Sequence, residues 1–215
     1  MKKILGISTF LVVLAASQVA NAGTISYSLT SDHCTGTCGT GPFGTVTLDD
    51  FNSTGDVQVT VTLNGNGFVE TGFDGSFGFN LIGDPTISVT PPSGWSLLST
   101  TAGDPNAHPP QYSFDGFGQF NYVLVCDSCN GGSNPYYGTL TFDVIAAGLN
   151  IGSFAELSSI PPGDTQAYFV ADIIGTNGNT GPVGATGVPD GGSTVTLLGS
   201  VLLGIGMLRR RFSKS

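Results

Sequence analysis

Hydrophobic and polar residues alternate along two stretches of the chain. Residues 57–63, VQVTVTL, place an apolar side chain at every odd-numbered position, and residues 138–144, GTLTFDV, do so at every even-numbered position from Leu140 onward. Strict alternation predicts a half-buried β-strand, because successive side chains of a strand point to opposite faces. Further strand-like runs lie at residues 44–51, 76–83, 86–90, 119–125 and 167–174.

Sequences rich in glycine, proline and asparagine separate these runs, among them NGNG, PPSG and CNGGSNP. Such residues favour turns, and no long helical period interrupts the pattern. We therefore predict an all-β fold, an antiparallel β-sandwich or jelly roll formed by residues 23–174 as one domain. Residues 175–187 contain Val183 as their only bulky apolar residue, so we expect a flexible Gly-rich stalk there.

The N-terminus has the three parts of a secretory signal peptide. A pair of lysines precedes an apolar stretch at residues 4–16, and Ala20-Asn21-Ala22 supplies small residues for the cleavage site. We predict a signal helix in residues 1–22, removed by signal peptidase between Ala22 and Gly23. The protein is then exported through the inner membrane.

The C-terminus carries a second apolar segment between a turn and a basic cluster. The turn is Val188-Pro189-Asp190-Gly191-Gly192, and the cluster is Arg209-Arg210-Arg211. Residues 195–208 would form about 21 Å of helix against a hydrocarbon core of roughly 30 Å. A transmembrane helix over residues 193–208 is therefore a marginal anchor. Its arginines would stay in the cytoplasm, which places the body of the protein outside.

This order of turn motif, apolar helix and arginine cluster, over residues 188–215, resembles the PEP-CTERM sorting signals that exosortases process in biofilm-forming Gram-negative bacteria. Asp190-Gly191 stands where the commoner motif has Glu-Pro, so the tail looks like a Val-Pro-Asp-Gly-Gly variant. The body is similar to uncharacterised β-rich ectodomains that precede such tails, notably in FDGFGQFNYVL and CDSCNGGSNP. The resemblance implies processing by an exosortase-type membrane protease, transient anchoring in the inner membrane, and a final place at the cell surface or in the extracellular matrix.

Charge is distributed unevenly along the chain. All fifteen acidic residues lie between Gly23 and Leu208, and this segment contains no lysine or arginine. A surface without basic residues does not attract nucleic acid phosphates, so nucleic acid is excluded as a partner. The acidity favours solubility and does not itself require a bound cation.

Four cysteines lie in the exported body, at Cys34, Cys38, Cys126 and Cys129. Export makes disulfides the expected state. Local pairs, Cys34 with Cys38 and Cys126 with Cys129, are favoured because cysteines separated by a short loop encounter each other first. Crossed pairs would stabilise more in the entropic model, and a four-cysteine zinc site is a further alternative.

Groups for catalysis are few. The chain has only two histidines, His33 and His108, and no GxSxG sequence, so we expect no enzyme and no cofactor. We expect no metal site either, although Asp50 and Asn52 in DDFNSTGD have the spacing of a weak calcium candidate that lacks the terminal glutamate.

Aromatic residues near turns are the best material for a binding site. Trp95, Tyr136 and Tyr137 could stack on sugars, or they could belong to the core. The sequence thus predicts an exported, sortase-processed protein with a structural or adhesive role in the exopolysaccharide or biofilm matrix. A carbohydrate-binding module, with exopolysaccharide as partner, is the alternative, and a hydrolase is third.

Overall fold

The fold is that of a computed structural model, which describes residues 23–51, 55–72, 75–98, 112–129, 131–159 and 163–189. The predicted signal peptide and the predicted transmembrane helix lie outside these residues. Within them, no helix is long and apolar enough to cross a membrane. The strands pair antiparallel, and the one helix described is the short 3-10 helix η1 (Ile151–Phe154). The prediction of an all-β antiparallel fold is confirmed.

The first sheet has five strands in the order β1-β3-β4-β12-β7. They are β1 (Thr24–Leu29), β3 (Gly44–Asp49), β4 (Asp56–Leu63), β12 (Leu140–Ile145) and β7 (Ser88–Thr90). The two alternating stretches form the centre of this sheet, β4 and β12, with Val59 opposite Phe142. Val57, Val59 and Val61 are buried and the polar residues between them are not, as the alternation predicts.

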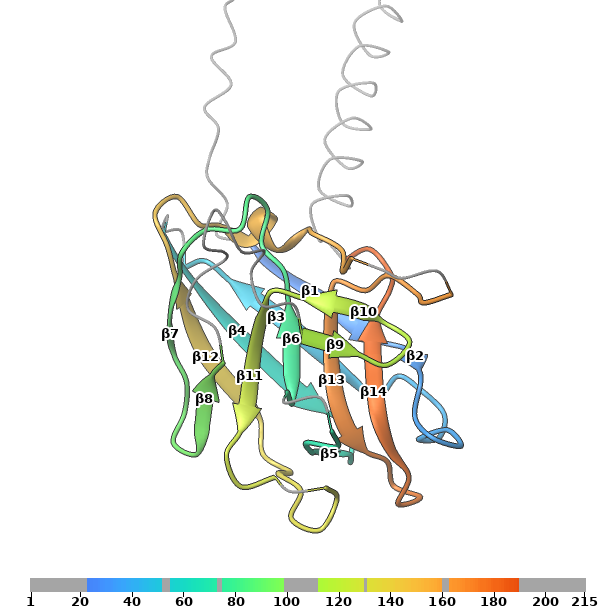
Figure 1. The fold of residues 1–215 in the computed structure, drawn as a ribbon. Helices are drawn as coiled ribbons and strands as arrows, with labels where there is room; N and C mark the ends of the chain where they lie inside the picture. The colour runs from blue at the N-terminus through green and yellow to red at the C-terminus, as the bar shows by residue number, and fades with distance from the viewer. Residues whose placement is uncertain are drawn as a thin grey trace, which may run out of the picture.

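The second sheet follows the order β2-β14-β13-β6-β11-β8, with β5 paired to β13. Its strands are β2 (Ser31–Asp32), β14 (Thr180–Ala185), β13 (Phe169–Ile174), β6 (Phe77–Phe79), β11 (Tyr122–Cys126), β8 (Trp95–Leu97) and β5 (Gly67–Phe68). Consecutive strands alternate between the two sheets several times along the chain (Figure 1).

The two sheets pack face to face across one hydrophobic core (Figure 1). Aromatic rings connect the layers: Tyr27 of β1 lies 4.8 Å from Phe169 of β13, and Phe77 of β6 lies 6.0 Å from Phe142 of β12, measured between ring centroids. Burial of these large side chains is the main stabilising contribution in such a two-layer domain.

A small second core lies on the outer face of the second sheet. The hairpin of β9 (Tyr112–Phe114) and β10 (Gly118–Phe120) covers this face (Figure 1). Its phenylalanines pack against Val123 and Val170, which point away from the sandwich core. β13 is therefore buried on both sides over most of its length.

The predicted flexible stalk at residues 175–187 is wrong for residues 180–185. Residues 180–185 form β14, which pairs with β13 along its whole length, from Phe169 opposite Ala185 to Ile174 opposite Thr180. Small residues are required here rather than being a sign of flexibility: a side chain at Gly184 would come within 2.4 Å of the Phe117 ring. The domain thus extends to Ala185.

Candidate functional site

A pocket of about 130 Å³ opens on the outer face of the second sheet, beside the β9–β10 hairpin. This volume is far more than one water molecule needs. The pocket lies where the beginning of β14 meets the segment after β2 and the turn after β9. Its functional groups belong to His33, Thr35, Thr71, Asp115 and Asp172, and the ring of Phe114 adds an apolar surface.

Asp172 supplies the buried carboxylate of this pocket. It follows Val170 by two residues on β13 and so shares the outer face of the sheet, while Ala171 and Ile173 belong to the sandwich core. Its side chain is 5 % exposed. Oδ2 accepts hydrogen bonds from the amide nitrogen of Thr71 at 2.7 Å and from its hydroxyl at 2.6 Å. Oδ1 is buried and has no partner among the described residues.

The environment of Asp172 disfavours its charge. Burial raises the pKa of this carboxyl from 3.8 to about 6, and the nearby Glu70 carboxylate adds to the rise. The two hydrogen bonds from Thr71, with a smaller contribution from the backbone N–H of Ile173, act in the opposite direction, because they stabilise the charged form. Any further hydrogen-bond donor that reaches Oδ1 would stabilise the charged form of this carboxylate.

The rim of the pocket is polar and has no basic partner from lysine or arginine. Thr35, Thr71 and Asp115 are exposed, and His33 is half-buried. The His33 ring lies edge-on against Phe117, with 4.5 Å between the ring centroids, and its backbone nitrogen donates to the carbonyl of Pro182. The imidazole is therefore positioned by the Phe117 ring, and the backbone of His33 is fixed by its hydrogen bond to Pro182.

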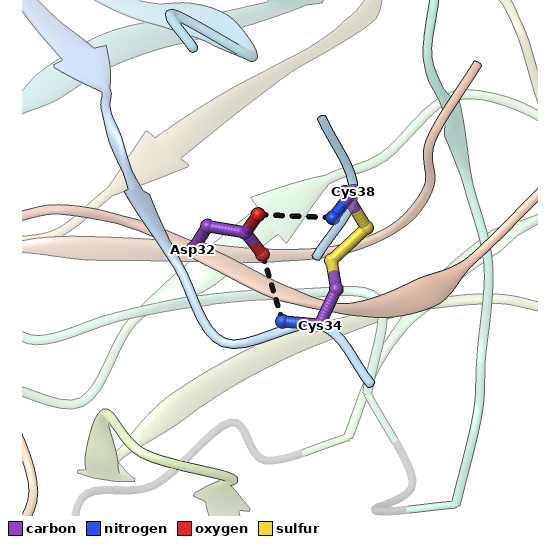
Figure 2. Close-up of side chains that lie close together, drawn as sticks. All are labelled: Asp32, Cys34 and Cys38. Atoms are coloured by element: carbon purple, nitrogen blue, oxygen red, sulfur yellow. Dashed lines mark hydrogen bonds between the residues drawn. A yellow bond between two sulfur atoms is a disulfide. The ribbon is translucent and has the colours of Figure 1, made fainter. Parts of the chain in front are cut away.

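The first cysteine pair lies next to this pocket and forms a disulfide, Cys34–Cys38. Figure 2 shows Asp32 bridging the same loop, since its carboxylate accepts hydrogen bonds from the amides of Cys34 at 2.8 Å and Cys38 at 2.9 Å. The Thr37 hydroxyl donates to it as well. Asp32, Cys34 and Cys38 come close enough together to suggest a metal centre, but the sulfur atoms are bonded to each other and the carboxylate is occupied by the loop.

The second pair, Cys126–Cys129, closes a turn after β11. The expectation of local pairing is confirmed, and the crossed pairs and the four-cysteine zinc site are wrong, because each cysteine bonds to its sequence neighbour. A turn keeps the two partners of each pair close before the sheets assemble.

The three aromatic residues proposed for sugar stacking have different places. Trp95 on β8 is 5 % exposed and packs edge-on against Phe68 at 5.2 Å and against Tyr136 at 5.6 Å. It belongs to the core, so its faces are not available to a ligand. Tyr136 is half-buried, and Tyr137 is 67 % exposed. Only Tyr137 retains an open ring surface among the three.

Of the calcium pair, Asn52 lies outside the described residues, whereas Asp50 is buried and accepts a hydrogen bond from the backbone nitrogen of Gly23 at 3.2 Å. Ala20, Ala22 and His108 also lie outside, as do Asp190, Gly191, Gly192, Arg209, Arg210 and Arg211. Val188 is described and exposed, and Pro189 is the last described residue.

Sequence reasoning missed Asp172. The signal was present in AYFVADII, where a single carboxylate interrupts an otherwise apolar strand. Charged residues are almost never fully buried without a partner, so an isolated aspartate in a run that reads as a buried strand indicates either an edge or a site. Thr71 lies 101 positions away in sequence, and no local pattern connects the two.

Comparison with known proteins finds a sorting-signal motif at the C-terminus. Residues 187–212 match the VPDSG-CTERM motif, a C-terminal sorting-signal family related to PEP-CTERM. The chain has Gly191 where the motif's name has serine. No curated protein and no solved structure matches the chain. The motif is consistent with export and cell-surface association, and it implies processing by a membrane-associated sorting enzyme.

Proposed function

We propose that this protein is exported, processed by an exosortase-type membrane protease, and displayed at the cell surface or in the exopolysaccharide matrix, where its β-sandwich has a structural or adhesive role without catalysis. The observation that carries the proposal is the sorting-motif match at residues 187–212. It begins two positions after the last residue of β14, Ala185. The sorting motif therefore follows the folded domain directly in the sequence.

The short connection limits the geometry before processing. At about 3.5 Å per residue, residues 186–192 span at most about 25 Å between β14 and the predicted transmembrane helix. The sandwich would therefore stay close to the outer surface of the inner membrane until cleavage in the Val188-Pro189-Asp190 region releases it. Since residues 23–187 contain fourteen acidic residues and no lysine or arginine, the released domain would be repelled by anionic headgroups.

The mass of the intact exported protein tests this proposal. The expected form begins at Gly23 and ends near Pro189, and trypsin does not digest it even in denaturant, because it contains no lysine or arginine. A variant with Arg209, Arg210 and Arg211 all changed to alanine should lose orderly processing, because the cytoplasmic stop is gone. Retention of residues 209–214 in the final form would instead make the tail a permanent anchor and contradict the proposal.

Carbohydrate binding is the second function we propose, as the means of adhesion. The observation that favours it is the polar pocket with its buried, incompletely bonded carboxylate, rather than the aromatic residues that suggested it from sequence. Binding would attach the displayed domain to the polysaccharide around it.

A further inference from the structure

We propose that the Asp172 pocket binds one edge of a neutral sugar unit, with Oδ1 of Asp172 accepting a hydrogen bond from a sugar hydroxyl. This inference deepens the carbohydrate-binding function proposed above and rests on it. The sorting proposal is independent, because it concerns residues 187–212 and is tested by mass alone.

The Asp172 carboxylate has one unused acceptor. Oδ2 already has two donors, both from Thr71, whereas Oδ1 is buried without a partner among the described residues. Leaving a buried acceptor unsatisfied is unfavourable, and more so for a charged group. Lysine and arginine, the usual partners, do not occur between residues 23 and 208. A donor that a ligand brings into the pocket would satisfy this acceptor.

The acidic groups of the pocket limit the charge that a ligand can carry. Asp172 and the exposed Asp115 both line the pocket, and Glu70 lies near enough to Asp172 to raise its pKa, so an anionic ligand would be repelled. A calcium ion takes six to eight oxygen ligands. Asp172 has only one oxygen left to offer, and within the described ranges it belongs to no group of three histidine, cysteine or carboxylate side chains that could hold a metal ion. A neutral molecule with several hydroxyl groups fits these constraints better.

The pocket is lined by hydroxyl groups and the ring of Phe114. Thr35, Thr71 and Thr180 line the pocket, and a hydroxyl can both donate and accept. His33 and Asp115 add further polar groups, and Phe114 offers an apolar surface to the C–H groups of a sugar ring. A few convergent polar groups around a small apolar surface are typical of ligand pockets. The volume of about 130 Å³ suits one edge of a ring rather than an oligosaccharide.

Hydrogen bonds and a disulfide hold the segments that line the pocket. The backbone of Asp172 is fixed on both sides, because its nitrogen donates to the carbonyl of Ser76 and its carbonyl accepts from the nitrogen of Val69. The segment from His33 to Thr35 is held by the adjacent Cys34–Cys38 disulfide and by the amide of Thr35 bonding to Thr180. A preformed pocket spends little binding free energy on ordering its own groups.

The test uses the exported protein, labelled for NMR, and the methyl glycosides of glucose, mannose and galactose as separate probes. We expect at least one glycoside to shift the signals of the Asp172 carboxyl and the Thr71 amide as it is titrated in. Asp172→Asn should weaken that binding by about tenfold or more, the size expected for losing a hydrogen bond to a charged group. Asp127→Asn is the matched control, since Asp127 is exposed and its side chain bonds only to the Ser96 hydroxyl among the contacts described.

A second variant guards against a folding defect in the first. Thr35 is exposed on the rim, so Thr35→Trp should leave the fold intact and block the mouth, which abolishes binding. The proposal is overturned if no glycoside shifts these signals, or if binding survives both Asp172→Asn and Thr35→Trp. It is also overturned if calcium chloride shifts the Asp172 and Thr71 signals and the glycosides do not, because the pocket would then be a cation site.

Discussion

The backbone nitrogen of Gly23 lies 3.2 Å from Oδ1 of Asp50, a buried carboxylate that directly follows β3. The register of β1 and β3 brings the two together, since Thr24 is opposite Asp49 and its hydroxyl bonds to that carboxylate. If signal peptidase cleaves between Ala22 and Gly23, this nitrogen becomes an ammonium group. Maturation then adds a cation to a domain that has no lysine or arginine.

We predict that Asp50→Asn lowers the free energy of unfolding of the mature protein by about 1.5 to 3 kcal/mol, because the acceptor of the Gly23 ammonium group loses its negative charge. Urea denaturation measures the change. Acetylation of the Gly23 amine is the matched chemical control, since it removes the charge and leaves the carboxylate. Equal stability of the acetylated and free-amine forms would show that the pair contributes nothing.

The raised pKa of Asp172 predicts a pH dependence of stability. Its folded value is about 6 and its unfolded value is near 3.8, so the folded state binds the proton more tightly. The resulting stabilisation is complete below about pH 4 and is lost as the pH rises through 6. The groups around the carboxyl are Thr71, Glu70, and the His33 and Asp115 side chains of the pocket.

Asp172→Asn should remove this dependence, because asparagine does not titrate. Relative to the wild type, we expect the variant to gain up to about 3 kcal/mol between pH 4 and pH 7. Urea denaturation at a series of pH values gives both curves. Parallel curves for the two proteins would mean that Asp172 titrates equally in the folded and unfolded states.

Asp32 holds the Cys34–Cys38 loop through two amide donors (Figure 2) and through the Thr37 hydroxyl. Asp32→Ala leaves these donors without their acceptor, and we expect a loss of about 1 to 3 kcal/mol. Thermal and urea denaturation measure it, with Asp127→Asn as a surface comparison. A loss of less than half a kcal/mol would show that solvent replaces the carboxylate without cost.

Trp95 lies in the core and Tyr137 on the surface, so their substitution should affect stability differently. Trp95→Ala should cost about 3 to 5 kcal/mol, because it leaves a cavity beside Phe68 and Tyr136. Tyr137→Ala should change stability by less than about 0.5 kcal/mol, since that ring is largely exposed. If instead Trp95→Ala folds normally and selectively abolishes glycan binding, Trp95 is a ligand residue and the buried position is wrong.

Much of the fold follows from the sequence, because its signals are local. The alternation in residues 57–63 and 138–144 identifies the two central strands, since a strand with one buried face must repeat with a period of two. The two disulfides are equally local, three and four positions apart. The matched sorting motif and the predicted signal peptide are likewise patterns of consecutive residues, so they can be read without a fold.

The remaining features depend on tertiary packing. β14 has no hydrophobic pattern because Gly184 must admit the Phe117 ring, and the hairpin that supplies this ring is far away in sequence. Trp95 is buried because Phe68 and Tyr136 converge on it from other strands. The Asp172 pocket forms where the segment after β2, the turn after β9 and the beginning of β14 meet beside β13. Thr71 bonds only one of the two carboxylate oxygens there. A site assembled from such distant segments leaves no periodic trace, since burial and hydrogen bonding are set by which segments meet in space.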